Sequence, residues 1–162
     1  MGALVNPDYA DVDLQRKQLQ EAPRTLTLEL QIESARTERE ISTAFEVIVQ
    51  RGGSAVLVTN DPFLAAQRHH IIALAARHVI PVMHEQREYP LAGGLMSYGA
   101  SIADALRQGG IYVGRILKGQ KPADLPVVQS SRFDFVINLR TAQALGLKIP
   151  PGILAIADEV IE

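Results

Sequence analysis

The fold of this chain is decided by Gly93–Pro126, which reads GGLMSYGASIADALRQGGIYVGRILKGQKPADLP. Within it, Leu95–Tyr98 follows a glycine pair and is typical of a short strand. A helix is then expected from Ser101 to Lys118, with Asp104 completing a capping box three residues after the serine hydroxyl. Its apolar side chains recur on one face, which predicts that another part of the structure covers that face. They are Ile102, Ala105, Leu106, Val113, Ile116 and Leu117.

The composition is that of a single globular domain. Nearly half of the 162 residues are hydrophobic and 21% are charged, which excludes a disordered chain. A net charge of −2 without a Lys/Arg cluster excludes nucleic acid and anionic membrane surfaces as obvious partners. The absence of cysteine excludes disulfides, thiolate metal sites and thiol nucleophiles.

No apolar run reaches the roughly 18–20 residues of a membrane span. No secretion signal is recognisable at the N-terminus, so the chain is expected in the cytoplasm if it is expressed as it stands.

The first part of the chain alternates between strand and helix patterns. Ala3–Val5 is a short apolar run before a turn, and the period-two pattern of Leu26–Ile32 predicts a strand near a sheet edge. Between them, a helix is expected from Asp11 or Asp13 to about Ala22.

Two helices in the middle of the chain have clear start signals. Thr37 and Glu40 form a capping box before a helix that should end at Gly52–Gly53. Asp61 is expected as an N-cap, with Pro62 at the first helical position. The inner stripe of this second helix is expected to be Leu64, Ile71, Ile72, Ala75 and Val79. The strands predicted here are Ala55–Val58 and Ile80–Met83.

The C-terminal third continues the alternation. The predicted elements are a strand at Phe133–Ile137, a cap at Asn138, a helix at Thr141–Leu145 ended by Gly146, a helical turn at Ile153–Ala157 and a strand at Glu159–Ile161. The whole pattern predicts an α/β fold, with a mostly parallel sheet and helices on both faces.

Polar residues follow four of the predicted strands. The four segments are Asn6–Tyr9, Ser34–Arg36, Asn60–Asp61 and Glu85–Arg87. Parallel strands end at the same edge of a sheet, where ligands bind in open α/β folds. Two of the segments lead into capped helix N-termini, which can receive a carboxylate or another anion. The alternative is that these residues are only caps and turns, and for Asn6 and Asp61 taken singly both interpretations stay open.

Catalytic and metal sites are not predicted. The sequence has no GxSxG, P-loop or GxGxxG motif. Ser97 and Ser101 have no histidine in a recognisable relation to them. His69 and His70 lack both a nucleophile partner and a metal ligand at helical spacing. His84, at a predicted strand end, could touch a ligand. We therefore expect no enzyme activity, no metal and no cofactor.

Several separate pieces of the sequence resemble one protein family. They are residues 93–99 (GGLMSYG), 112–119 (YVGRILKG), 121–127 (KPADLPV), 133–139 (FDFVINL), 144–151 (ALGLKIPP) and 157–162 (ADEVIE). Together they resemble the ABC-transporter substrate-binding proteins whose relatives include tryptophan- and tyrosine-binding receptors. The resemblance runs over essentially the whole chain. It implies the type I periplasmic-binding-protein fold, in which two α/β lobes joined by a hinge clamp a small ligand.

The resemblance also implies how this chain is divided. Residues 1–97 and 133–162 correspond to the second lobe, and residues 98–132 correspond to a hinge-crossing arm of the first lobe, with a strand at Leu125–Val128. Family members are about twice as long and begin with a secretion signal and a complete first lobe, so we expect a truncated receptor, the C-terminal lobe only. The implied function is a solute-binding component of an ABC importer, located in the periplasm. The implied partners are a small amino-acid-like ligand and, if a complete receptor forms, an ABC permease.

The resemblance places ligand contacts at the loops already singled out. Relatives hold an amino-acid-like ligand near the positions of Asn60 and Asp61, while Tyr98 lies at the second hinge crossing. The expected ligand-binding residues are Asn6, Arg36, Asn60, Asp61, Glu85 and Tyr98.

The apolar face of the helix from Ser101 to Lys118 predicts association. Five large aliphatic side chains at about 1.5–3 kcal/mol each give roughly 7–15 kcal/mol, which is comparable with the whole stability of a domain, about 5–15 kcal/mol. We therefore expect a homodimer through residues 98–132. Two alternatives remain open: a cytoplasmic ligand-sensing or dimerisation module derived from such a lobe, and a small flavodoxin-like enzyme.

Overall fold

The strands of the chain form one twisted, mostly parallel sheet. The computed structural model describes residues 1–26, 28–128 and 132–162, and these form a seven-stranded sheet in the order β2-β1-β3-β4-β5-β6-β7. All neighbouring strands are parallel except β5 and β6, which are antiparallel. The strands are β1 (Gly2–Val5), β2 (Gln31–Ser34), β3 (Val56–Val58), β4 (Val82–His84), β5 (Met96–Ala100), β6 (Phe133–Asn138) and β7 (Glu159–Ile161).

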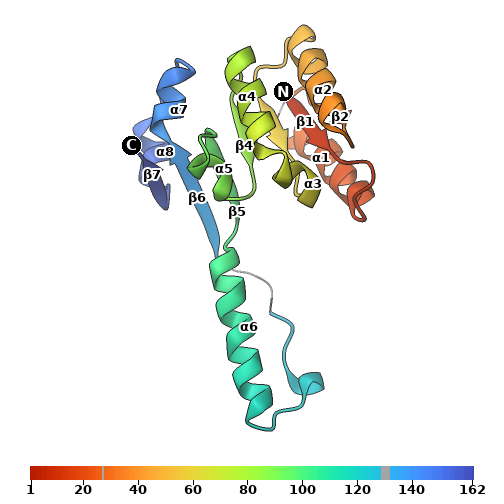
Figure 1. The fold of residues 1–162 in the computed structure, drawn as a ribbon, viewed down its shortest axis with the longest axis vertical. Coiled ribbons are helices and arrows are strands. Elements are labelled where there is room, and N and C mark those ends of the chain that lie inside the picture. Colours follow the sequence, from red (N-terminus) through yellow and green to blue (C-terminus); the bar gives the residue numbers. More distant parts are fainter. Residues whose placement is uncertain (27, 129–131) are drawn as a thin grey trace.

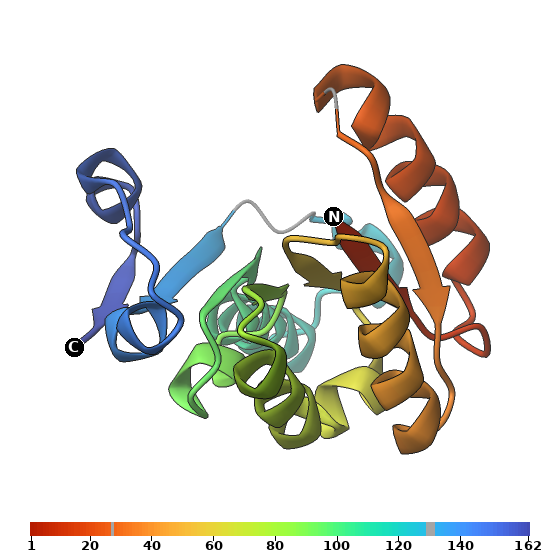
Figure 2. The same cartoon turned by 90° about the horizontal axis from the view of Figure 1, so that it is seen from above.

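Helices cover both faces of the sheet, as the sequence pattern predicts. They are α1 (Val12–Leu26), α2 (Glu38–Gln50), α3 (Pro62–Ala66), α4 (Arg68–His78), α5 (Glu88–Leu91), α6 (Ile102–Leu117), α7 (Leu139–Ala144) and α8 (Pro151–Ala155), with a 3₁₀ turn η1 at Pro122–Asp124. Strand β1 alternates between two cores: Leu4 packs with α2 and α4, whereas Ala3 and Val5 pack with Leu19 of α1. Helices α1 and α2 therefore lie on opposite faces of the sheet (Figure 2).

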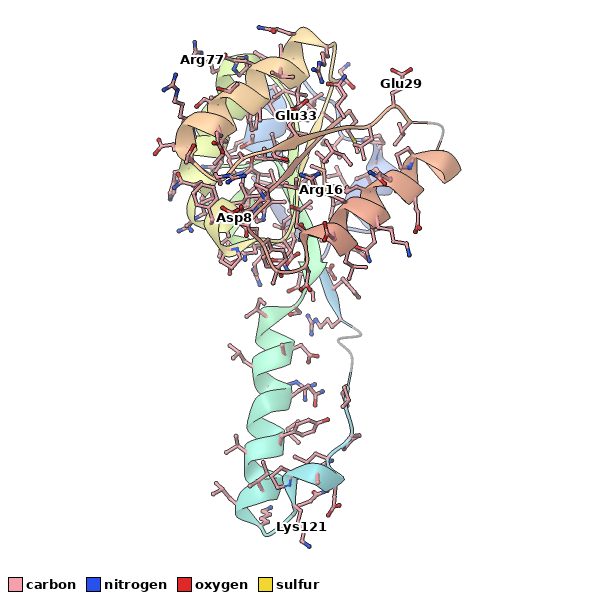
Figure 3. The ribbon with its side chains drawn as sticks, turned by 90° about the vertical axis from the view of Figure 1, so that its right-hand side faces the viewer. Asp8, Arg16, Glu29, Glu33, Arg77 and Lys121 are labelled. Carbon is pink, nitrogen blue, oxygen red and sulfur yellow. The ribbon has the colours of Figure 1, made fainter. Side chains whose placement is uncertain are left out.

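Helix α6 and the segment after it project away from the sheet as an arm (Figure 1). Figure 3 shows Lys121 at the far tip of this arm, remote from the sheet. The hydroxyl of Tyr112 donates a hydrogen bond to the carbonyl of Pro126 at 2.7 Å and so joins the two legs of the arm. No residue of α6 is buried.

Three predicted helix starts are confirmed by their hydrogen bonds. The side-chain oxygens of Thr37, Asp61 and Asn138 accept backbone N–H groups at 3.2, 2.8 and 3.1 Å, respectively. Each bond satisfies an N–H that would otherwise lack a helical partner. The carboxylate of Glu40 accepts from the backbone N–H of Arg36 at 2.8 Å, one residue before the position that the capping-box pattern predicts.

The predicted strand at Leu26–Ile32 is wrong in its boundaries. Helix α1 continues to Leu26, with Pro23 in its last turn, and β2 begins only at Gln31. Residue 27 lies outside the described residues. The strand begins late because its only partner is β1, whose pairing with it starts at Gly2↔Gln31. The edge position of this strand is confirmed.

Two predictions within the arm are also wrong. Ser101 occupies the N-cap position of α6, yet its side chain makes no capping hydrogen bond. Asp104, predicted to complete the box, instead accepts hydrogen bonds from the guanidinium of Arg107 at 2.8 and 3.1 Å. Residues 125–128 are not a strand, and no described strand lies beside them to supply ladder hydrogen bonds.

The helix predicted after Asp61 is divided in two. Gln67 ends α3 and precedes the first residue of α4. Leu64, Ile71 and Ala75 are buried as predicted. Val79 is not: it is 61% exposed and takes the left-handed conformation (φ 50°) that ends α4. Helix α5 was not anticipated at all.

Candidate functional site

An open cleft lies where the carboxyl ends of β3, β4 and β5 meet helix α1. Its volume is about 360 Å³, near the lower end of the range of roughly 300–1,000 Å³ that is common for small-molecule sites. It is lined by Gln15, Gln18, Leu19, Ala22, Leu57, Val58, Thr59, Asn60, His84, Glu85 and Tyr98. This is the edge of the sheet at which the polar loops were predicted to gather.

Helix α1 forms one wall of the cleft and is fixed to the opposite wall by Gln15. The side-chain Nε2 of Gln15 donates to the backbone carbonyl of Asn60 at 2.6 Å. This bond determines which end of the amide is the oxygen. The Oε1 atom is then left as a buried acceptor without a hydrogen-bond partner among the described residues.

The loop after β3 contributes Thr59 and Asn60. The hydroxyl of Thr59 donates to the carbonyl of Leu4 at 3.0 Å, and the backbone N–H of Thr59 bonds the same oxygen at 3.1 Å. The proton of this hydroxyl is therefore committed to β1, while its lone pairs remain able to accept. Asn60 is exposed at the mouth of the cleft.

The end of β4 places a neutral histidine in the wall of the cleft. The Nδ1 atom of His84 accepts from the backbone N–H of Gln86 at 3.0 Å, so the ring proton lies on Nε2. The ring stacks on Tyr89 with centroids 5.4 Å apart. Burial lowers the pKa of His84 to about 4, although the negative charge of Glu88 acts in the opposite direction. At neutral pH this imidazole carries no charge.

Glu85 follows directly and lines both this cleft and a smaller neighbouring pocket beside Arg87 and Gly99. Burial raises the pKa of this carboxyl above its ordinary value. No described residue forms an ion pair with it. Gly99 of β5 lies against the Glu85 backbone, and a Cβ at that position would collide with the Glu85 carbonyl oxygen. The glycine is therefore needed for β5 to pass so close to this residue.

Tyr98 supplies an aromatic face at the edge of the cleft. It is 50% exposed, and its ring stacks on Phe133 with centroids 5.5 Å apart. Phe135 meets the same ring edge-on at 6.1 Å. These two neighbours on β6 hold the tyrosine ring in a fixed orientation.

The other predicted site residues lie elsewhere. Asn6 and Asp61 are buried, and the Asn6 amide donates to the Asp61 carboxylate at 3.0 Å. This bond locks the loops after β1 and β3 together, while the other carboxylate oxygen of Asp61 caps α3. Arg36 makes an exposed 3.8 Å ion pair with Asp8. None of these three residues lines the cleft, so their role as ligand contacts stays a prediction.

The cleft thus joins three of the six predicted residues, namely Asn60, Glu85 and Tyr98. Sequence reasoning missed Gln15, Gln18 and Thr59. The two glutamines have a recognisable signal in retrospect, because positions 15, 18, 19 and 22 follow the spacing of one helical face. That face combines amides with small and aliphatic side chains, as a wall of a binding site does.

A histidine between a serine and a glutamate, which the sequence did not predict, lies outside the cleft on α2 and α4. The Nε2 atom of His70 lies 2.9 Å from the Ser42 hydroxyl, and its Nδ1 atom lies 3.4 Å from the Glu38 carboxylate. The order Ser-His-Glu is that of a catalytic triad. However, Ser42 lies inside α2, where backbone N–H groups are used along the helix and cannot stabilise an oxyanion. We interpret these contacts of His70 as a link between α2 and α4.

Neither a metal site nor a membrane-spanning helix is found in the described part of the chain. No group of three or more His, Asp or Glu side chains there is arranged to hold a metal ion. No helix among the same residues has the length and hydropathy needed to cross a bilayer.

Comparison with known proteins identifies the family. Two solved structures superpose with a TM-score of 0.86: a conserved domain protein from Vibrio cholerae (25% identity) and an ABC domain in complex with L-Trp from Streptococcus pneumoniae (26%). A ligand-free, open substrate-binding protein with adhesive properties from Clostridium difficile (21% identity, TM-score 0.73) shares the fold.

These alignments cover nearly all of this chain but only about half of each relative. They extend over 98%, 99% and 99% of this chain, and over 53%, 54% and 53% of the three solved structures, in the order given above. No curated protein sequence matches the chain. The family of ABC transporter substrate-binding proteins matches residues 1–161. The chain belongs to this family.

Proposed function

We propose that this chain forms one wall of the ligand cleft in the solute-binding component of an ABC importer, and that the ligand is a small amino-acid-like molecule. The observation that carries the proposal is the open cleft of about 360 Å³ at the carboxyl ends of β3, β4 and β5, where Asn60, Glu85 and Tyr98 converge. The L-Trp in the Streptococcus pneumoniae structure supports the ligand class. An ABC permease is the corresponding partner, and the periplasm is the corresponding location.

Titration of the isotope-labelled chain by NMR tests this role. Because the chain spans about half of its solved relatives, we expect binding by a single wall to be weak, in the millimolar range. Saturable shifts with L-tryptophan, L-tyrosine or L-leucine should be confined to the amides around Asn60, Glu85 and Tyr98. Shifts spread over the whole molecule, or none with any of the three, would contradict the proposal. Nanomolar affinity would contradict the single-wall arrangement.

We also propose that the chain divides into a ligand-binding lobe (residues 1–97 and 133–162) and the arm (residues 98–132), and that the arm mediates a homodimer. The arm exposes a stripe of aliphatic side chains on α6, including Leu106 at 73% and Leu117 at 82% exposed. Ile102 and Val113 continue the same stripe. An exposed apolar surface of this kind is costly in water and is readily covered by a second copy across a two-fold axis.

Sedimentation of the purified chain tests the dimer. The wild-type chain should sediment as a dimer at micromolar concentration. Leu106→Lys, which places a charge in the centre of the stripe, should yield a monomer. Arg115→Ala, a change of an exposed side chain elsewhere on the same helix, should leave the dimer intact. A wild-type chain that sediments as a compact monomer would refute the proposal.

A further inference from the structure

The exposed aliphatic stripe of α6 has a symmetric spacing. Its members are Ile102, Leu106, Val113 and Leu117, which are separated by four, seven and four positions. With 3.6 residues per turn, they lie within an arc of about 60° around the helix and form one face. All four are more than half exposed, whereas Ile111 and Ile116 lie off this face and are less exposed. The same spacing is therefore met from either end of the helix.

The midpoint of this stripe carries no side chain. Gly109 and Gly110 occupy it, halfway between Leu106 and Val113. A glycine inside a helix is less stable than an alanine, because its backbone loses more freedom on folding. No contact within the chain accounts for the pair: apart from the neighbouring helix backbone, a Cβ added at either glycine would meet no described atom within 4 Å. The stripe thus has a notch at its centre that no described part of the chain fills.

A second copy of α6 that runs in the opposite direction is complementary to this face. In a pair related by a two-fold axis, the same patch of each copy meets itself. With the axis at the glycine pair, Leu106 of each copy lies level with Val113 of the other, and the ends of the two stripes meet in the same way. The two notches then face each other, and glycine at the crossing lets the two backbones approach closely.

The charges of the arm favour this direction over a parallel one. Arg115, Lys118 and Lys121 lie towards the tip of the arm (Figure 3), and Asp124 offsets only one of the three. A parallel pair would bring two positively charged tips together. An antiparallel pair separates the tips by about the length of the helix, roughly 24 Å for 16 residues. This exceeds the screening length of about 8 Å at physiological ionic strength.

Building on the proposed dimer, we infer that two copies of this chain join through an antiparallel pair of α6 helices that cross at Gly109 and Gly110. The tip of each arm then lies beside the base of the other arm. Lys118 comes level with Ser101 of the second copy, which directly follows the end of β5 at Ala100. The tip of one copy is thereby brought to the edge of the sheet at which we place the ligand cleft of the other.

The residue at the crossing tests the inference by the sign of its effect. Gly109→Leu adds apolar surface to the helix and blocks the close approach of the backbones. A loose association of apolar surfaces would become tighter in this variant. The antiparallel crossing predicts the opposite: the dissociation constant of the dimer, measured by sedimentation, should rise by at least about tenfold, as overpacking does elsewhere. Arg115→Leu adds the same side chain on the opposite side of the helix and should leave this constant within about twofold of the wild type.

Cross-linking through introduced cysteines tests the direction of the pair. The chain contains no cysteine, so two introduced thiols can react only with each other. Under a mild oxidant, Leu106→Cys and Val113→Cys should each remain uncross-linked alone. In the antiparallel pair, identical positions are offset by seven residues, about 10 Å along the axis, whereas a disulfide needs Cα atoms within about 7 Å. An equimolar mixture of the two variants should form a covalent dimer. A mixture of Ala103→Cys and Arg115→Cys, at exposed positions outside the stripe, should not.

The outcomes separate the inference from the proposed dimer. The antiparallel crossing is overturned, while a dimer of the wild-type chain stands, if Gly109→Leu leaves association unchanged or tightens it. The same holds if either single-cysteine variant cross-links with itself, or if the mixture of Leu106→Cys and Val113→Cys does not cross-link. A wild-type chain that stays monomeric at micromolar concentration overturns both the crossing and the dimer.

Discussion

The buried imidazole of His84 makes stability dependent on pH over a defined window. In the folded chain its pKa is lowered by burial to about 4, against 6.5 for an exposed histidine. At about 1.4 kcal/mol per pKa unit, this difference corresponds to about 3 kcal/mol. Above pH 6.5 both folded and unfolded states are neutral at this position, and the stability is at its full value. As the pH falls from 6.5 to about 4, only the unfolded state takes up the proton, so up to about 3 kcal/mol is lost.

His84→Asn removes this titration and keeps an acceptor near the position of Nδ1, which bonds Gln86. The raised pKa of Glu85 has the opposite effect, because the folded state protonates first and gains stability as the pH falls. Both chains should therefore also carry Glu85→Gln. Urea unfolding followed by circular dichroism, at steps between pH 6.5 and about 4, gives the difference in free energy of unfolding. That difference should change by about 3 kcal/mol in favour of the asparagine chain. If the two chains lose stability in parallel, the histidine is not held neutral by burial.

Three further substitutions test the packing, each by urea unfolding. Val79→Gly should stabilise the chain by about 1 kcal/mol, because Val79 is a β-branched residue at φ 50° and is mostly exposed; an unchanged midpoint would mean that the left-handed conformation carries no strain. Gly94→Ala should destabilise by about 1–3 kcal/mol, since the added methyl would collide with the ring of Tyr89; a neutral effect would show that the ring can move aside. Asp61→Ala should lower the free energy of unfolding by about 2 kcal/mol or more, because it removes the cap on the Leu64 N–H and leaves the buried Asn6 amide without its acceptor. A loss no larger than that of a simple exposed N-cap would argue against the buried bond.

Signals that act within a few residues were readable from the sequence. The N-caps Thr37, Asp61 and Asn138 depend on a side chain and a backbone N–H three residues away, so the local pattern contains the whole interaction. The glycines that end helices are signals of the same local kind. Gly52 and Gly146 take left-handed backbone conformations that other residues adopt at a cost.

Boundaries that depend on a distant partner were not readable. β2 begins at Gln31 because β1 offers only four residues to pair with. Those partner residues lie about thirty positions earlier in the sequence, so the local pattern around Gln31 does not contain this information. The apolar run at 125–128 has the composition of a strand, but a strand exists only where a neighbour supplies hydrogen bonds, and the described sheet ends without one there. A run with high β-propensity can therefore fit into a sheet, but its propensity alone does not show that it forms a strand.

The location of the candidate site was predictable from the sequence, but the set of side chains that line it was not. The rule that ligands bind at the carboxyl ends of parallel strands located the edge, and three of the six predicted residues line the cleft there. Which polar side chains face the cleft is decided by hydrogen bonds across long sequence separations. Asn6 and Asp61 are 55 residues apart and satisfy one another, and Gln15 reaches the carbonyl of Asn60 across 45 residues.

These long-range bonds also determine what the start of α3 can bind. The sequence places Asp61 at the start of α3, a position that attracts negative charge. In the folded chain that negative charge is the Asp61 carboxylate itself, one oxygen on the backbone of Leu64 and the other on Asn6. The helix terminus is thus already satisfied and offers nothing to an external anion. Glu85, by contrast, has no ion-pair partner among the described residues.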